Sequence, residues 1–215
     1  MNDQLTNVLT FAVLGFMGFR LVTGLRHSRS AHGRSIVSQV WHRIGWRHVW
    51  PVPLVLIVVV AAATALMQIP GLSWGWWSML GGTGNPVFGE SDATVGTVWE
   101  WIIPLTFMCL LLPALPLFAY AEERMFRAGS QGWSRPRRVL KVLQFGMIHA
   151  LIGIPLGAAL ALSLGGAYFM WVYLREYRRH HDPTGATLES TAAHTVYNGL
   201  IVLLVVVAVG LNAVL

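Results

Sequence analysis

Charged side chains are scarce in this chain: Asp, Glu, Lys and Arg make up 11% of its 215 residues, whereas 55% are hydrophobic. This balance excludes an ordinary water-soluble domain and indicates that lipid is the solvent. Cysteine is almost absent, because Cys109 is the only one, and this excludes an internal disulfide. Acidic residues are fewer than basic ones, 9 against 15, so the formal net charge is +6.

Apolar stretches recur along the whole chain, and a helix needs roughly 20 such residues to cross a hydrocarbon core of about 30 Å. The first stretch lacks a basic start and is interrupted by Arg20, so we interpret it as a retained anchor and not as a signal peptide. We predict an all-α, polytopic membrane helix bundle that forms a single membrane domain, residues 1–215. Its six transmembrane helices are predicted at 5–25, 51–69, 101–123, 138–154, 156–175 and 190–214.

The basic residues alternate from one connection to the next. Segment 70–98, predicted to be an irregular outer loop rich in Trp and Gly, has no Lys or Arg. With six spans and both termini outside, the positive-inside rule places all basic clusters in the cytoplasm. The basic first loop then faces anionic lipid headgroups, which we favour over nucleic acid as its partner. Apart from Arg20, every Lys and Arg falls within 26–47, 124–141 or 175–179.

Four polar residues stand within or beside the apolar segments. They are His149, His194, Glu122 and Glu123, and the two glutamates directly follow a long apolar run. Burying such a group in a bilayer costs roughly 2.5–3.5 kcal/mol on insertion scales, so a functional role is the default hypothesis.

The glutamates belong to the pattern Glu-Glu-x-x-x-Arg. On a helix Glu123 and Arg127 share a face, so an ion pair is available, whereas Glu122 points about 100° away. One glutamate is then held while the other is free to react. The alternative is an ordinary helix-end salt bridge at the cytoplasmic surface.

The histidines belong to two similar patterns of four-residue spacing. Phe145 lies one turn before His149, and His194 lies one turn before Asn198. His194 and Asn198 can donate hydrogen bonds to one ligand atom. Taken singly, each histidine is better explained as an interhelical hydrogen bond in a membrane bundle.

Together, Glu-Glu-x-x-x-Arg, Phe-x-x-x-His and His-x-x-x-Asn, in this order and on three different spans, resemble the signature of the CPBP family of intramembrane proteases. The family includes CAAX prenyl endopeptidases of the Ras-converting type and bacterial bacteriocin-processing relatives. The resemblance covers roughly residues 100–210 and implies a catalytic core at 99–215. The remaining helices, basic loop and outer loop of 1–98 match sparsely. A bacterial plasma membrane is the implied location.

The resemblance implies an endopeptidase that hydrolyses a peptide bond of a membrane-associated, CAAX-like or bacteriocin-type substrate. Glu122 would activate water as the general base, assisted by His149. His194 and Asn198 would form the oxyanion hole. Three further residues would support them: Glu123, Arg127 and Phe145.

No cofactor is expected, because the chain lacks the His-Glu-x-x-His pattern of common zinc proteases. Zinc is the alternative, with Glu122, His149 and His194 as ligands. The alternative function is a non-catalytic membrane scaffold or immunity partner with the same fold. A proton-coupled carrier is less favoured, since no paired repeats are evident.

Depth is a difficulty for this site. His149 lies about 16 Å along a straight helix from Arg138, whereas Glu122 directly precedes the basic loop. Either the third helix continues past Arg127 inside the protein, or the fourth begins deeper than its predicted bounds. Pro104, Pro113 and Pro116 predict bends in the third helix, and such bends would open a cavity.

Overall fold

The computed structural model describes residues 2–76 and 96–214, and most of the predicted outer loop 70–98 lies outside them. Every regular element in the described ranges is helical. The α-helices are α1 (Asn2–Arg29), α2 (Ala31–Arg43), α3 (Trp46–Val49), α4 (Pro51–Met67), α6 (Trp99–Leu111), α7 (Leu115–Phe126), α8 (Arg135–Met147), α9 (Leu156–His180) and α10 (Pro183–Val214). The short 3₁₀ helices are η2 (Leu112–Ala114), η3 (Ser130–Gly132) and η4 (Ile148–Ile152).

Each predicted span coincides with helix. In the described part of the chain, four helical stretches are long and apolar enough to cross a membrane: Trp46–Met67, Leu105–Gly132, Leu156–His180 and Pro183–Ala208. The all-α membrane class is therefore confirmed. The first and fourth spans, 5–25 and 138–154, fall on α1 and on α8 with η4, and their crossing stays a prediction.

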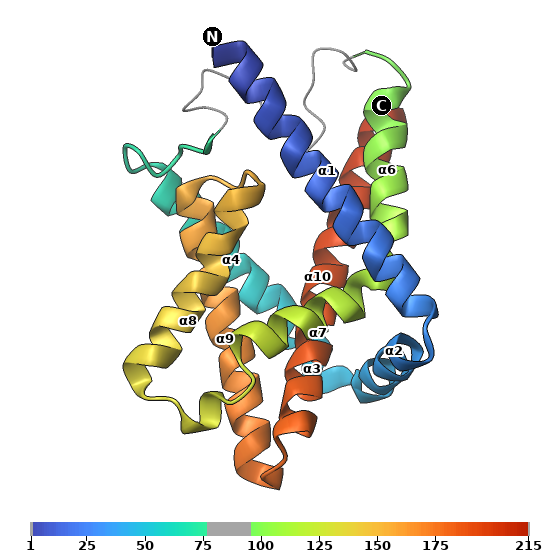
Figure 1. The fold of residues 1–215 in the computed structure, drawn as a ribbon. Helices are drawn as coiled ribbons and strands as arrows, with labels where there is room; N and C mark the ends of the chain where they lie inside the picture. Colours follow the sequence, from blue (N-terminus) through green and yellow to red (C-terminus); the bar gives the residue numbers. More distant parts are fainter. Residues whose placement is uncertain (1, 77–95, 215) are drawn as a thin grey trace.

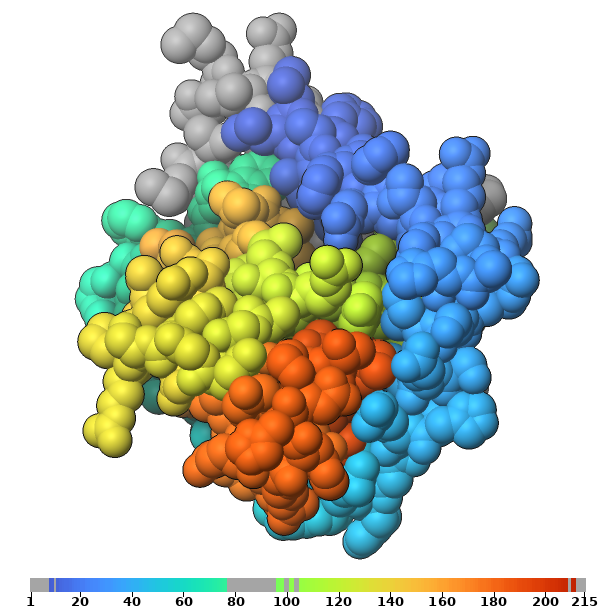
Figure 2. Space-filling view, turned by 60° about the horizontal axis from the view of Figure 1, so that its bottom comes forward, coloured from blue at the N-terminus to red at the C-terminus, as the bar shows by residue number. Residues whose placement is uncertain are grey.

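The bundle is built around α9 and α10, which meet at a tight turn and run antiparallel (Figure 1). Helix α9 packs against α4 and α8 as well as α10. Helix α10 also contacts α7 and α2, so it lies between the N-terminal helices and the rest of the bundle. Seen from the end in Figure 2, the α9–α10 turn protrudes between the yellow α8 and the blue α2–α3 region.

A sharp change of direction separates α6 from α7. Figure 1 shows α7 lying across α10, whereas α6 runs beside its far end. The bend falls at η2, where Pro113 and Pro116 remove two backbone donors from the helix ladder. The predicted bend is thus present, and it carries the end of α7 to the side of α10.

Helices α8 and α9 approach closely through glycine. A Cβ built on Gly146 would come within 2.7 Å of the Ser163 backbone nitrogen and closer still to the Ser163 hydroxyl and the Ala159 carbonyl oxygen. Small residues allow such backbone contact between membrane helices. Gly146 therefore sets the distance at which α8 meets α9.

Gly146→Ala should force α8 away from α9 and lower the free energy of unfolding by about 1–3 kcal/mol. Thermal unfolding of the purified protein in mild detergent, followed by tryptophan fluorescence, measures the effect as a lower Tm. Gly199→Ala is the control, because no atom lies within 4 Å of a Cβ at that position. Equal Tm values for the two variants would contradict the close packing.

Candidate active site

A buried carboxylate, Glu123, is the centre of a hydrogen-bonded cluster. Its Oε1 accepts hydrogen bonds from Arg127 Nη1 and from His194 Nδ1, each at 2.9 Å. Its Oε2 accepts from the Ser190 hydroxyl, which also lies 3.0 Å from the Phe169 carbonyl oxygen. The Glu123 and Arg127 side chains are fully buried. The ion pair predicted from the spacing is therefore present at the end of α7, and it is buried in the interior instead of exposed at a surface.

Aromatic rings surround Arg127 and His194, two of the hydrogen-bond partners of Glu123. The Arg127 guanidinium lies 4.0 Å from the centre of the Phe145 ring. The His194 ring stacks on Phe169, with ring centres 4.3 Å apart. Such cation–π and ring contacts are favourable where water is excluded, and they fix the orientation of both side chains. The cluster is therefore rigid as well as buried.

Glu122 lies in front of this cluster. Its side chain is 31% exposed, yet its Oε2 is buried and has no hydrogen-bond partner among the described residues. That oxygen lies 3.7 Å from His194 Nε2, which is too long for a hydrogen bond. Both atoms can instead bond to one third atom placed between them. Because Nδ1 of His194 is held by Glu123, Nε2 is the ring nitrogen that remains available.

Two predicted site residues lie beside the cluster. His149 donates from Nδ1 to the Phe145 carbonyl oxygen at 2.8 Å, and its ring meets the Phe145 ring edge to face. The same Phe145 ring contacts His194 with a centre distance of 5.5 Å. Among the described residues, Glu122 forms an ion pair with His194 and none with His149. Asn198 is half-buried on α10, one turn beyond His194.

Glu122, His149 and His194 are also the residues that the zinc alternative requires as ligands. The described residues contain no group of three or more His, Cys, Asp or Glu placed to hold a metal ion. Glu122, His149 and His194 are therefore not arranged as a zinc ligand set here.

Sequence reasoning missed three members of the cluster. Ser190 lies one helical turn before His194, so its position on the same face of α10 was available from the spacing. Phe169 and Gly166 come from α9, and no local pattern relates them to the motifs. Gly166 accepts from Arg127 Nη2 at 3.5 Å and leaves the room that the Phe145 ring occupies.

A second buried carboxylate, Glu189, was also missed. Arg47 binds it through Nε at 2.8 Å and through Nη2 at 3.0 Å. His48 Nε2 lies 2.9 Å from the same carboxylate, and His48 Nδ1 accepts from the Gly45 backbone N–H. The His48 side chain is buried, although it lies in a run of basic residues. These contacts attach α3 to α10.

Comparison of the chain with protein-family models, with curated protein sequences and with solved structures gave no match. The fold and the site therefore define the class: an all-helical membrane protein with a buried cluster of glutamate, arginine, histidine and serine.

Replacing Glu123 with Leu should leave the Arg127 charge buried without a partner and lower the free energy of unfolding by about 3–5 kcal/mol. Chemical unfolding of the purified protein measures the loss. The double variant Glu123→Leu/Arg127→Met should recover a large part of it, because both charges are then removed.

Glu176→Gln is the matched control, because it removes a pair at 3.5 Å with the exposed side chain of His180, and a surface pair contributes about 0–1 kcal/mol. A Glu123→Leu loss no greater than that of the control would show that the buried pair does not hold the bundle.

Proposed function

We propose that this protein is an intramembrane endopeptidase of the CPBP type. The observation that supports the proposal most directly is the pair of facing atoms in front of the buried cluster. Glu122 Oε2 and His194 Nε2 are 3.7 Å apart, and the oxygen has no partner among the described residues. A water molecule beside them can bond to both atoms, whereas a reacting carbonyl oxygen can accept a hydrogen bond from His194 Nε2 only.

In the proposed reaction Glu122 is the general base that takes a proton from the attacking water. A carboxylate suits this role only if it is not neutralised by a cation, and Arg127 is occupied by Glu123. Glu123 thus protects the reactivity of Glu122. His149, which flanks the same Phe145 ring as His194, assists from the neighbouring helix end.

Oxyanion stabilisation is proposed for His194 and Asn198. Both project from α10, one turn apart, so they share a face. Donors that are fixed before the reaction stabilise the developing negative charge most strongly. Stacking on Phe169 and the hydrogen bond to Glu123 fix His194 in this way. Because its Nδ1–H is given to Glu123, His194 donates to the oxyanion from Nε2 in the doubly protonated imidazolium form, which this step therefore requires. The amide of Asn198 has no side-chain partner in the described structure that would compete for it.

The location supports a substrate at the membrane. The cluster residues lie within the apolar stretches Leu105–Gly132, Leu156–His180 and Pro183–Ala208. We infer six spans with both termini outside, basic loops in the cytoplasm, and a bacterial plasma membrane as the site of action. The substrate is a membrane-associated peptide whose scissile bond reaches the cluster from the cytoplasmic side.

Glu122→Gln should lower the cleavage rate at least about 10²-fold, because the amide cannot act as the base. The full chain is reconstituted in vesicles with bacterial membrane proteins, and new N-termini are quantified by mass spectrometry. Asp182→Asn is the matched control, since it makes the same acid-to-amide change at a residue outside the Glu123 cluster and outside the Glu189 contacts. Cleavage that survives Glu122→Gln would refute the proposed base.

A non-catalytic scaffold or immunity partner is the rival outcome of the same experiment. It predicts no new N-termini with the wild-type protein and a cellular phenotype that persists in the Glu122→Gln strain.

Metal dependence is tested separately with 1,10-phenanthroline and EDTA. The proposed mechanism uses a glutamate base, so cleavage by the vesicle-reconstituted protein should change less than about twofold after chelation. A loss that zinc restores would instead support the zinc alternative with Glu122, His149 and His194 as ligands.

A further inference from the structure

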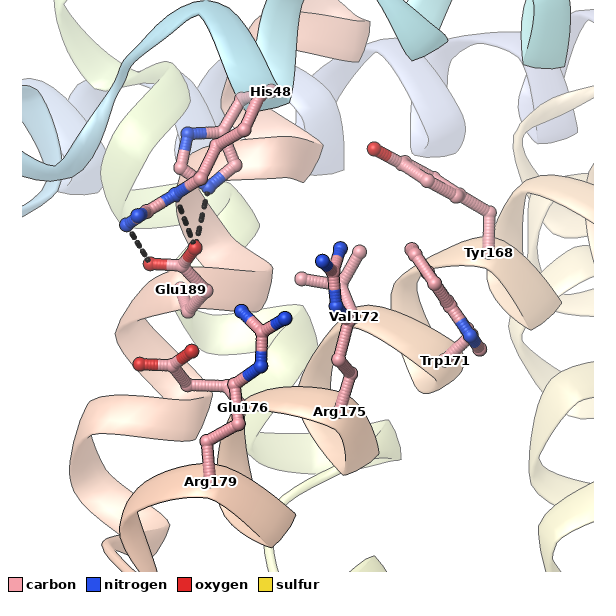
Figure 3. A pocket seen from close by; sticks show the side chains of 9 residues that line it. His48, Tyr168, Trp171, Val172, Arg175, Glu176, Arg179 and Glu189 are labelled. Carbon is pink, nitrogen blue, oxygen red and sulfur yellow. Dashed lines mark hydrogen bonds and ion pairs between the residues drawn. The ribbon is translucent and has the colours of Figure 1, made fainter.

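A pocket on the other side of α10 is not used by the proposed reaction. It lies between α3, α9 and the first turns of α10, and Figure 3 shows its side chains. The guanidinium groups of Arg175 and Arg179 extend from α9 into the space between the Glu189 carboxylate and the aromatic side chains. Tyr168 and Trp171 form the opposite wall. The pocket thus combines aromatic rings with several cations.

The two carboxylates that line this pocket already have partners. Glu189 is bound by Arg47 through two nitrogens and by His48. Glu176 pairs with His180, which is one turn away. The positive charge that remains available is therefore on the α9 arginines.

Those arginines have no anionic partner of their own. Among the described residues, neither Arg175 nor Arg179 has a carboxylate within ion-pair distance. Arg175 lies over the Trp171 ring, 5.1 Å from its centre, in a cation–π contact. A planar guanidinium can form two parallel hydrogen bonds to a phosphate or carboxylate. The geometry therefore favours an anion with several oxygens.

The pocket is placed where lipid phosphates lie. It is formed where the apolar stretch Leu156–His180 ends and where Trp46–Met67 begins. Exposed tryptophans surround this level: Trp46 is 76% exposed and Trp50 53%, and Trp171 in the pocket wall is 48% exposed. Exposed tryptophan at helix ends is typical of the membrane–water interface.

We propose that this pocket binds the phosphate of an anionic phospholipid headgroup through Arg175 and Arg179. The aromatic wall then lies beside the glycerol region of the lipid, and the two arginines bind its negatively charged phosphate. The proposal rests on the membrane location of the helices and is independent of peptide hydrolysis. A soluble phosphate would offer the same oxygens, so the test separates the two sources.

Native mass spectrometry of the full chain in detergent tests the proposal with dioleoylphosphatidylglycerol as the probe. Dioleoylphosphatidylcholine and inorganic phosphate are titrated in parallel. Arg175→Ala/Arg179→Ala should weaken binding of the first phosphatidylglycerol at least about tenfold. Arg135→Ala/Arg137→Ala removes the same charge from the start of α8 and should change it less than about twofold. If the Arg175→Ala/Arg179→Ala variant does not unfold cooperatively on heating, the single variant Arg179→Ala is used in its place.

Three results would overturn the proposal. If both double variants lost the same affinity for phosphatidylglycerol, the lipid would be attracted by the overall charge of the protein and would not be bound at this pocket. Equal affinity for phosphatidylcholine would remove the requirement for an anionic headgroup. Binding of inorganic phosphate alone, with the same dependence on Arg175 and Arg179, would assign the pocket to a soluble anion.

Discussion

The structure depends on the burial of one ion pair. Moving the charges of Glu123 and Arg127 out of water costs several kcal/mol for each ion, and their attraction offsets this cost only if further hydrogen bonds satisfy the remaining atoms. Here the carboxylate also accepts from Ser190 and His194, and the guanidinium faces the ring of Phe145. These partners come from α8 and α10. Helices α7, α8 and α10 must therefore be packed together before the cost of burying the pair is offset.

Part of this arrangement could be predicted from the sequence, because helical spacing fixes which residues share a face. The Glu123–Arg127 pair followed from a separation of four residues, and so did the common face of His194 and Asn198. Spacing does not say which helices meet. The hydrogen bond between Glu123 and His194 joins residues 71 apart, and it depends on the turn of α7 across α10. The prolines predicted a bend but not its direction.

The Glu189 contacts were beyond prediction for a related reason. Arg47 belongs to a run of basic residues that is typical of a cytoplasmic loop, and nothing local distinguishes it from its neighbours. Its partner is 142 positions away. Consecutive residues of α10, Glu189 and Ser190, point in different directions and bind α3 and α7 respectively. One turn of helix thus joins the N-terminal helices to the cluster.

The contrast between Glu122 and Glu123 also has a geometric consequence. Successive residues of a helix differ by about 100° in direction, and α7 uses this angle to place one carboxylate in the interior and the next at its margin. Arg127 and the rings of Phe145 and Phe169 close the inner side. In the proposed reaction a peptide would therefore approach along the flank of α7 that bears Glu122. The face of the peptide bond presented to the carboxylate would then be decided by the pitch of a single helix.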